Sequence, residues 1–317
     1  MIEVQRLSKF YGQRKAVDDV TFTVNKGEIL GFLGPNGAGK STTMKILTCF
    51  MPASSGMAKV AGYDVFEHPI EVKKRVGYLP ENPPVYREMV VAEYLMYKAA
   101  LHGIKGPKAK AAVDTALGKC GLGHVRGRLI GNLSKGYRQR VGLAQSIVHN
   151  PGVLILDEPT VGLDPKQIIE IRELIKSFAG DHTVILSTHI LPEVEATCSR
   201  VLIINEGKIV AVDTLGAISS RLRQANVFTV LVQGASGDLT AKIQAVSGVA
   251  SVMPGNDSDG QRFTVTAHDN VDVRRSVADL IIKSGAGLLE LKRESLSLEE
   301  VFLKLTTVEQ PSIEGRV

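Results

Sequence analysis

Hydrophobic and polar positions follow two successive patterns along the chain, and the change falls near residue 215. In the first part, short apolar runs bounded by turn residues alternate with stretches of helical spacing. The apolar runs predict buried parallel strands at 29–33, 153–156 and 184–187. The helical spacing predicts helices at 41–49 and 168–178. Strands that alternate with helices in this way predict an α/β domain with a mostly parallel sheet.

One stretch inside this domain has helical spacing throughout. Residues Val90 to Ser146 are rich in Ala, Leu and Lys, and apolar side chains recur at Val91, Leu95 and Ala99. A recurrence every three to four residues is that of an amphipathic helix. We therefore expect a helical insertion at about residues 88–148.

The last third of the chain changes to a period of two. Strand-like runs are separated by helical patterns in the order βαββαβ, which predicts a small α+β domain. The expected strands include 227–232, 262–266 and 288–291, and the expected helices are 239–246, 273–282 and a closing helix at 298–305.

These patterns set the expected domain boundaries. The α/β domain should occupy residues 1–217 and the α+β domain residues 227–306. A connector is expected at 218–226, and the tail at 307–317 is expected to be disordered.

Length and composition fit two globular domains and disfavour other classes of protein. The chain has 317 residues, of which 44% are hydrophobic and 22% charged. No apolar run approaches the roughly 18–20 residues that cross a bilayer, and the first residues lack the pattern of a secretory signal. The cysteines Cys49, Cys120 and Cys198 are too scattered for a disulfide framework or a zinc site, so we expect reduced thiols.

The net charge of +5 is unevenly distributed along the chain. Residues 227–317 hold 9 Lys and Arg against 12 Asp and Glu, a net charge of −3, so the remainder carries +8. Such a basic part can face phosphates, an acidic membrane surface or nucleic acid. Because the chain has no Trp and no alternation of aromatic and basic residues, nucleic acid is the least favoured of these partners.

A glycine-rich loop follows the strand predicted at 29–33. It fits the pattern G-x-x-x-x-G-K-[ST], in which backbone N–H groups and the start of a helix surround a phosphate. Lys40 is expected to reach the β- and γ-phosphates and Ser41 to give a hydroxyl to Mg²⁺. A glycine turn without a ligand is the alternative, but the motif is long and stands between a strand and a helix. The residues expected to bind ATP here are Gly34, Pro35, Asn36, Gly37, Ala38, Gly39, Lys40, Ser41 and Thr42.

Two acids follow the apolar run 153–156. The carboxyl end of a parallel strand lies at the edge of the sheet where the phosphate loop also lies. Asp157 can therefore hold the Mg²⁺ shell, and Glu158 can orient and deprotonate the attacking water. Two ordinary acids at a solvated strand end are the alternative.

A histidine, His189, follows the run 184–187. A lone histidine is more often structural or at the surface than catalytic. At this strand end, however, His189 can contact a γ-phosphate or support Glu158.

A third motif, Leu133-Ser134-Lys135-Gly136-Tyr137, lies at the end of the predicted insertion. Ser134 and Gly136 before a helix make either an anion-binding helix start or a simple helix cap. Together with the two other motifs, this segment resembles the signature of the ATP-binding subunits of ABC transporters. The resemblance covers about residues 2–214.

The resemblance assigns further roles. Tyr11 matches the aromatic residue that stacks on adenine, and Val17 matches a residue beside the ribose. Asp164, in Gly162-Leu163-Asp164, matches the D-loop, and His189 matches the switch histidine. The residues that would act on the ATP of a partner subunit are Ser134, Lys135, Gly136 and Asp164.

The sequence departs from the family pattern at two places. Lys135 and Tyr137 replace the usual Gly and Gln of the signature, and Glu81 stands where the family usually has a glutamine. A carboxylate at Glu81 still offers oxygen to Mg²⁺, but it adds negative charge beside the phosphates. The segments 78–83 and 133–140, with the C-terminal domain, resemble a narrower branch that includes gliding-motility subunits and ABC-2-type exporter ATPases.

The resemblance implies a P-loop NTPase that hydrolyses ATP with Mg²⁺ as a head-to-tail dimer with a second copy of itself. Separately encoded integral membrane permease subunits would convert closure of the dimer into transport. The chain would then be cytoplasmic and peripheral on the inner face of the cell membrane, and no nucleic-acid partner is expected. Two alternatives remain open: an ABC-type ATPase outside transport, in translation or DNA repair, and a nucleotide-sensing module that barely turns over.

Overall fold

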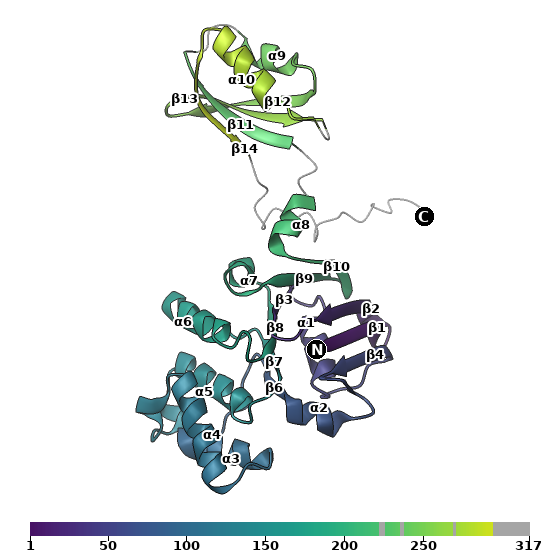
Figure 1. Ribbon diagram of the computed structural model, residues 1–317, viewed down its shortest axis with the longest axis vertical. Coiled ribbons are helices and arrows are strands. Elements are labelled where there is room, and N and C mark those ends of the chain that lie inside the picture. Colours follow the sequence, from purple (N-terminus) through teal and green to yellow (C-terminus); the bar gives the residue numbers. More distant parts are fainter. Residues whose placement is uncertain (222–225, 235–237, 269–270, 294–317) are drawn as a thin grey trace, which may run out of the picture. The chain divides into compact units, whose positions relative to one another are not determined.

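The computed structural model describes residues 1–221, 226–234, 238–268 and 271–293 (Figure 1). The chain divides into two compact units, Met1–Leu215 and Gly216–Val317. In the described residues, the first unit contains two sheets and two hydrophobic clusters, and the second unit contains one sheet and one cluster. The helix expected at 298–305 and the tail expected at 307–317 lie outside the described residues.

A six-stranded sheet forms the centre of the first unit, in the order β10-β9-β3-β8-β7-β6. Neighbouring strands from β9 to β6 pair in parallel, and β10 pairs with β9 antiparallel. Every residue of β3, β7 and β8 is buried, which explains why these strands are continuous apolar runs in the sequence. The bounds are β3 Ile29–Leu33, β6 Val76–Leu79, β7 Val153–Asp157, β8 Thr183–Thr188, β9 Arg200–Asn205 and β10 Lys208–Asp213.

A second, antiparallel sheet lies over one face of the central sheet, with helix α1 packed against both. Its order is β2-β1-β4-β5. Alternate residues of β7, Val153 and Ile155, enter the core on this side. The bounds are β1 Ile2–Tyr11, β2 Arg14–Val24, α1 Lys40–Leu47, β4 Ser55–Val60, β5 Tyr63–Asp64 and α2 Pro69–Arg75.

The predicted helical insertion is confirmed and packs against the opposite face of the central sheet (Figure 1). Leu154 and Leu156 of β7 enter this second core, together with apolar residues of the insertion and of α6. The strand is therefore buried on both faces. The bounds are α3 Val91–Leu101, α4 Gly106–Lys119, α5 Lys135–Ile147, α6 Pro165–Lys176 and α7 Leu191–Thr197, with short 3₁₀ turns at Gly123–Val125 and Ile130–Asn132.

The second unit has the predicted order βαββαβ. Its antiparallel sheet has the order β12-β13-β11-β14, and both helices pack on one face of it, around Phe228, Phe263 and Ile281. Part of the expected connector is helical, as α8. The bounds are α8 Leu215–Arg221, β11 Asn226–Gln233, α9 Leu239–Gln244, β12 Val249–Asp257, β13 Gly260–Ala267, α10 Arg274–Lys283 and β14 Gly287–Arg293.

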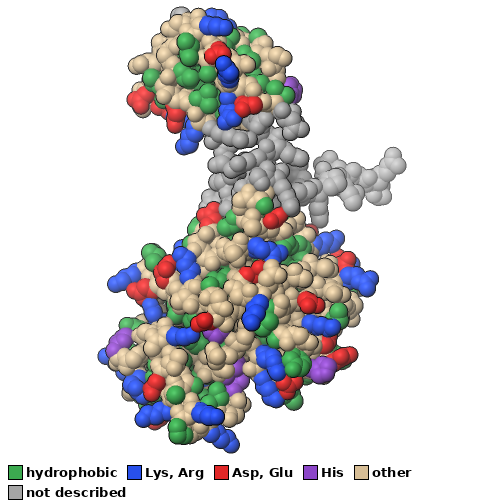
Figure 2. All heavy atoms as spheres, in the orientation of Figure 1, with side chains coloured by type: hydrophobic (Ala, Val, Ile, Leu, Met, Phe, Trp, Pro, Cys, Tyr) green, Lys and Arg blue, Asp and Glu red, His purple; other side chains and the backbone are tan. Residues whose placement is uncertain are grey.

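The distribution of charge and the length of the helices bear on membranes and polyanions as partners. Figure 2 shows basic and acidic side chains interspersed over the visible face of the first unit, so the excess positive charge is not gathered into one patch there. Within the described ranges, no helix combines the length and the apolar character that crossing a membrane requires.

The insertion approaches the central sheet very closely at Gly77 in β6. A Cβ atom there would overlap the backbone carbonyl oxygen of Ser146 in α5. We expect Gly77→Ala to lower the free energy of unfolding by about 1–3 kcal/mol, because either α5 or β6 must move. Urea unfolding followed by far-ultraviolet circular dichroism measures this change.

Gly118→Ala is the matched control. Gly118 lies in α4, and a Cβ atom there would meet nothing within 4 Å. The same substitution should therefore raise stability by up to about 1 kcal/mol through helix propensity. Equal losses in the two variants would show that the contact with Ser146 is not the cause.

A stacked histidine pair gives the first unit a pH-dependent stability. The rings of His149 and His102 lie 3.7 Å apart with planes at 5°. Burial, assisted by the charge of His102, lowers the pKa of His149 from 6.5 to about 4. The unfolded chain therefore binds more protons than the folded chain between these two values, and stability falls as the pH is lowered through that window.

We expect the free energy of unfolding to fall by about 2 kcal/mol between pH 7 and pH 5 through this group. His149→Phe keeps an aromatic ring in the stack but removes the titration, so the fall should be smaller in that variant. Urea unfolding at a series of pH values checks the prediction. The same pH slope in both proteins would contradict it.

Candidate active site

One cavity in the first unit brings together segments that are far apart in the sequence. Its volume is about 500 Å³. The segments meet because the parallel strands β3, β6, β7 and β8 end at the same edge of the sheet, where the β1–β2 hairpin joins them. The lining residues are Tyr11, Arg14, Ala16, Asn36, Gly37, Gly39, Lys40, Ser41, Thr42, Glu81, Glu158, Val161 and His189.

The glycine loop turns into α1 at Gly39. Gly39 has a φ of 106°, in the left-handed region, and a Cβ atom there would overlap the carbonyl oxygen of Ala16. Glycine is therefore required both by the backbone angle and by the close approach. The first turn of α1, with its positive dipole end, consequently lies in the wall of the cavity, a position suited to a phosphate group.

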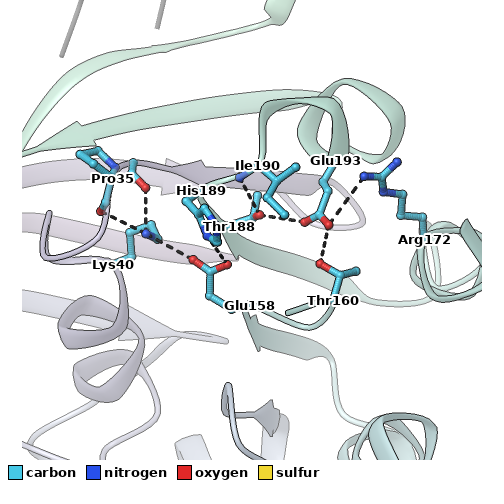
Figure 3. A network of polar contacts seen from close by, with 10 residues as sticks. Pro35, Lys40, Glu158, Thr160, Arg172, Thr188, His189, Ile190 and Glu193 are labelled. Atoms are coloured by element: carbon cyan, nitrogen blue, oxygen red, sulfur yellow. Dashed lines mark hydrogen bonds and ion pairs between the residues drawn. The ribbon is translucent and has the colours of Figure 1, made fainter. Parts of the chain in front are cut away.

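The ammonium group of Lys40 is buried in this cavity. Lys40 is 5% exposed, and its Nζ donates to the carbonyl oxygens of Gly34 at 2.8 Å and Pro35 at 3.2 Å. Nζ also lies 3.3 Å from Glu158 Oε1 (Figure 3). These acceptors compensate the buried charge, and phosphate oxygens can replace them without moving the cation out of the cavity.

Glu158 lies between two basic side chains. Its second carboxylate oxygen, Oε2, is 2.8 Å from His189 Nδ1 (Figure 3). The residue has a φ of 49° in the left-handed region, which is uncommon for a residue other than glycine. Its backbone N–H still donates to the Ser187 carbonyl oxygen at 2.9 Å. The chain thus turns sharply after β7 and presents the carboxylate to the cavity, oriented by Lys40 and His189.

Asp157 provides the observation that fits a magnesium ion. Its side chain is 2% exposed, and Oδ1 has no hydrogen-bond partner among the described residues. Burial and the charge of Asp157 raise the pKa of Tyr78 to about 12. Magnesium is usually held by one or two carboxylates together with phosphate oxygens and water. Asp157 is not among the lining residues, but its unpaired oxygen belongs to the last residue of β7, directly before the lining residue Glu158. Ser41 and Glu81 lie in the lining itself. Together these residues offer the oxygen types of this donor set.

Not every expected nucleotide contact lies in the lining. Val17 is fully buried in the core, whereas its neighbour Ala16 lines the cavity. The side chain of Val17 therefore does not reach the cavity, and Ala16 is the residue of this segment that faces it. Ala38 is also buried, and Gly34 and Pro35 contribute through their carbonyl oxygens to Lys40.

The signature residues Ser134 to Gly136 lie beside the D-loop residues Gly162 to Asp164, outside the lining of the nucleotide cavity. Ser134 caps α5 by accepting a hydrogen bond from Tyr137 N at 3.4 Å, and Asp164 caps α6 by accepting one from Gln167 N at 3.0 Å. The side chain of Gln167 covers Gly136, and Lys135 Nζ lies against Gly162. Four residues are expected to act on a partner's ATP, and none of them is among the described residues that line the cavity. They are Ser134, Lys135, Gly136 and Asp164.

Three lining residues, Arg14, Ala16 and Val161, were not expected from the sequence. Arg14 pairs with Tyr11 across the β1–β2 hairpin. The two-residue connection Gly12-Gln13 is the signal that places Tyr11 and Arg14 opposite each other. Arg14 therefore adds a positive charge beside the aromatic residue.

A glycine loop that opens a helix, a buried lysine and two acids at a strand end define a nucleotide-hydrolysing enzyme of the phosphate-loop class. A family model described as ABC transporter matches residues 17–161. The chain is 33% identical over 308 residues to the bacitracin transport ATP-binding protein BcrA of Bacillus licheniformis, with 96% of this chain and 97% of the relative covered. It is 33% identical over 309 residues to the daunorubicin/doxorubicin resistance ATP-binding protein DrrA of Streptomyces peucetius, with 96% and 92% covered.

A solved structure, described as the ATP-binding subunit of an ABC transporter, is similar with a TM-score of 0.64 and 31% identity. It covers 70% of this chain and 93% of its own length. The chain belongs to the ATP-binding proteins of ABC transporters. It is an ATPase of the exporter type that uses ATP and Mg²⁺.

Asp157→Asn should separate magnesium binding from folding. The amide removes a buried charge whose Oδ1 has no partner among the described residues, so the melting temperature without nucleotide should not fall. Magnesium affinity should fall by about 10–100-fold, the usual cost of altering such a carboxylate. Thermal shift with ATP, in the presence of Mg²⁺ or of a chelator, measures both effects. A full Mg²⁺-dependent shift in the variant would exclude Asp157 from the metal shell.

Proposed function

We propose that this chain hydrolyses ATP in two composite sites of a head-to-tail dimer. The proposal rests on the separation of the phosphate-loop cavity from the signature residues within one chain. The phosphate-loop cavity and the signature lie at different places on one chain, and the lining residues of the cavity do not include the signature. A two-fold dimer can bring the signature of one copy to the cavity of the other, and it forms two such sites at once.

Within one cavity, each side chain has a distinct proposed role. Tyr11 stacks on adenine and Ala16 lies beside the sugar. Lys40 binds the β- and γ-phosphates, and Ser41 and Asp157 would hold Mg²⁺, with Glu81 as a further oxygen donor. Bound Mg²⁺ would neutralise charge on the phosphate oxygens.

The chemical step is proposed to depend on Glu158. The carboxylate orients a water molecule and accepts its proton as the water oxygen attacks the γ-phosphorus, while the bond to the β-phosphate oxygen breaks. His189 holds this carboxylate through Oε2 and also reaches the γ-phosphate. Lys40 pairs with Glu158, so phosphates that compete for Lys40 would release Glu158 for the water molecule.

The partner copy completes the site. Its Ser134, Lys135 and Gly136 approach the γ-phosphate at the start of α5, where the helix dipole and the added lysine charge attract an anion. Its Asp164 approaches from the D-loop. Hydrolysis removes the shared phosphate contact, so the dimer opens, and the nucleotide shifts an equilibrium between two states.

The chain is proposed to be cytoplasmic, on the inner face of the cell membrane, bound to permease subunits that contact the cargo. Relatives aligned over nearly their whole length carry names that refer to bacitracin transport and to daunorubicin, doxorubicin or linearmycin resistance. This supports export of antibiotic-like compounds as the proposed transport activity.

Mixing two inactive variants tests the composite site. Lys40→Ala destroys the cavity of each copy, and Ser134→Arg destroys the signature, so each variant alone should be inactive. In a mixed dimer, one site combines an intact Lys40 with an intact Ser134. The mixture should therefore recover up to about a quarter of the wild-type rate, since half of randomly formed dimers are mixed and each has one intact site of two.

A concentration series of the unmutated chain, with Glu158→Gln as the inactive reference, completes this test. The rate per subunit should rise with protein concentration as dimers form. An inactive mixture, or a rate independent of concentration in a proven monomer, would overturn the composite site.

A further inference from the structure

A buried carboxylate outside the nucleotide cavity is linked to the proposed catalytic residues. Glu193 lies in the first turn of α7 and is 1% exposed. It does not line the cavity. Burying a carboxylate is costly unless its oxygens are paired, so its partners indicate what it stabilises.

The partners of Glu193 come from three separate segments (Figure 3). The hydroxyl of Thr160 donates to Oε1, and the hydroxyl of Thr188 donates to Oε2 at 2.8 Å. The guanidinium group of Arg172 lies 3.6 Å from Oε1. Both threonines are buried, at 2% and 0% exposure. One carboxylate therefore connects the loop after β7, the last residue of β8, and α6.

The hydrogen bond between Thr188 and Glu193 fixes the backbone on both sides of His189. The Thr188 hydroxyl donates to Glu193 and also accepts from Ile190 N at 3.0 Å. His189 lies between these two residues in sequence, and its Nδ1 contacts Glu158. A shift of the Thr188 hydroxyl would thus move the imidazole that orients the Glu158 carboxylate.

The hydrogen bond from Thr160 and the ion pair with Arg172 fix the path from Glu158 to the D-loop. Thr160 lies two residues after Glu158, and its carbonyl oxygen accepts from Leu163 N at 3.1 Å. Arg172 lies on α6, the helix that begins after its cap Asp164. Glu193 therefore holds the residues proposed to act on the chain's own ATP and the loop proposed to act on the partner's ATP as one unit.

We infer that Glu193 is a positioning residue for ATP hydrolysis, acting through Thr188 on His189 and through Thr160 on the D-loop. The inference rests on the proposed roles of Glu158, His189 and Asp164. Glu193 itself does not contact the nucleotide cavity. Its loss should therefore lower kcat and leave ATP binding nearly unchanged, because misplacement of catalytic groups by a fraction of an ångström slows chemistry more than it weakens binding.

The experiment is steady-state ATP hydrolysis by the full chain, with kcat and KM measured separately. Glu193→Gln, Thr188→Val and Thr160→Val should each lower kcat by about tenfold or more, and should change KM and the ATP-induced thermal shift by less than about threefold. Thr188→Ser and Thr160→Ser keep the hydroxyl and should recover most of the rate. The double variant Thr160→Val/Thr188→Val should lose less than the product of the single losses, because both hydroxyls act through one carboxylate.

Two control variants lie on the same helix. Thr197 is buried, and its hydroxyl has no partner among the described residues. Glu195 is exposed. Thr197→Val and Glu195→Gln should keep the wild-type kcat.

The outcomes separate the inference from the proposed function. If Glu158→Gln and His189→Ala keep full activity, the proposed catalytic roles fail. If those two variants lose activity while Glu193→Gln and both valine variants match Thr197→Val, only the role of Glu193 fails. Loss of kcat together with loss of ATP binding, without recovery in the serine variants, would also overturn positioning in favour of a purely structural role. If Glu193→Gln does not fold, the valine and serine pairs still decide the question.

Discussion

The arrangement of the active site depends on the buried charge of Lys40. An ammonium group that is 5% exposed needs acceptors on every side. Two loop carbonyl oxygens and Glu158 provide them, and Glu158 is in turn held by His189. The same group of contacts therefore stabilises the conformation of the loop and holds the carboxylate of Glu158 beside two basic side chains.

The sequence was most informative where one physical rule decided the outcome. Strands β3, β7 and β8 are buried on both faces, so they are continuous apolar runs, and their parallel pairing brings Lys40, Glu158 and His189 to one edge. The resemblance alone does not show which residue near position 17 faces the cavity: Val17 is buried in the core, and Ala16 lines the cavity. The register of β1 and β2 shifts between Lys9–Val17 and Leu7–Val20, and such an irregularity reverses which of two neighbouring residues faces the cavity. Strand β12 was implied only by the βαββαβ order, because it contains a proline and a glycine and is largely exposed.

The contacts of Glu193 have no sequence signal of their own. Thr160, Arg172, Thr188 and Glu193 belong to different elements, and each residue type has an ordinary alternative role as a helix or loop residue. Only the packing of α6 and α7 brings them together. Side-chain networks of this kind depend on the relative placement of several elements, which the period of a sequence does not encode. The network around Glu193 also links the loop that carries His189 with the loop that leads to Asp164, although the two belong to separate sequence motifs. In the proposed dimer, it could therefore couple the two nucleotide sites.

Strand β7 also constrains how this enzyme can evolve. Its side chains alternate between two cores, with Val153 and Ile155 in one and Leu154 and Leu156 in the other. On either face of β7, a change in side-chain volume or polarity should therefore lower the stability of the fold. Substitutions that adapt such an ATPase to other permeases and cargoes should therefore be tolerated better in the insertion, the loops and the second unit than in this strand, all five residues of which are buried.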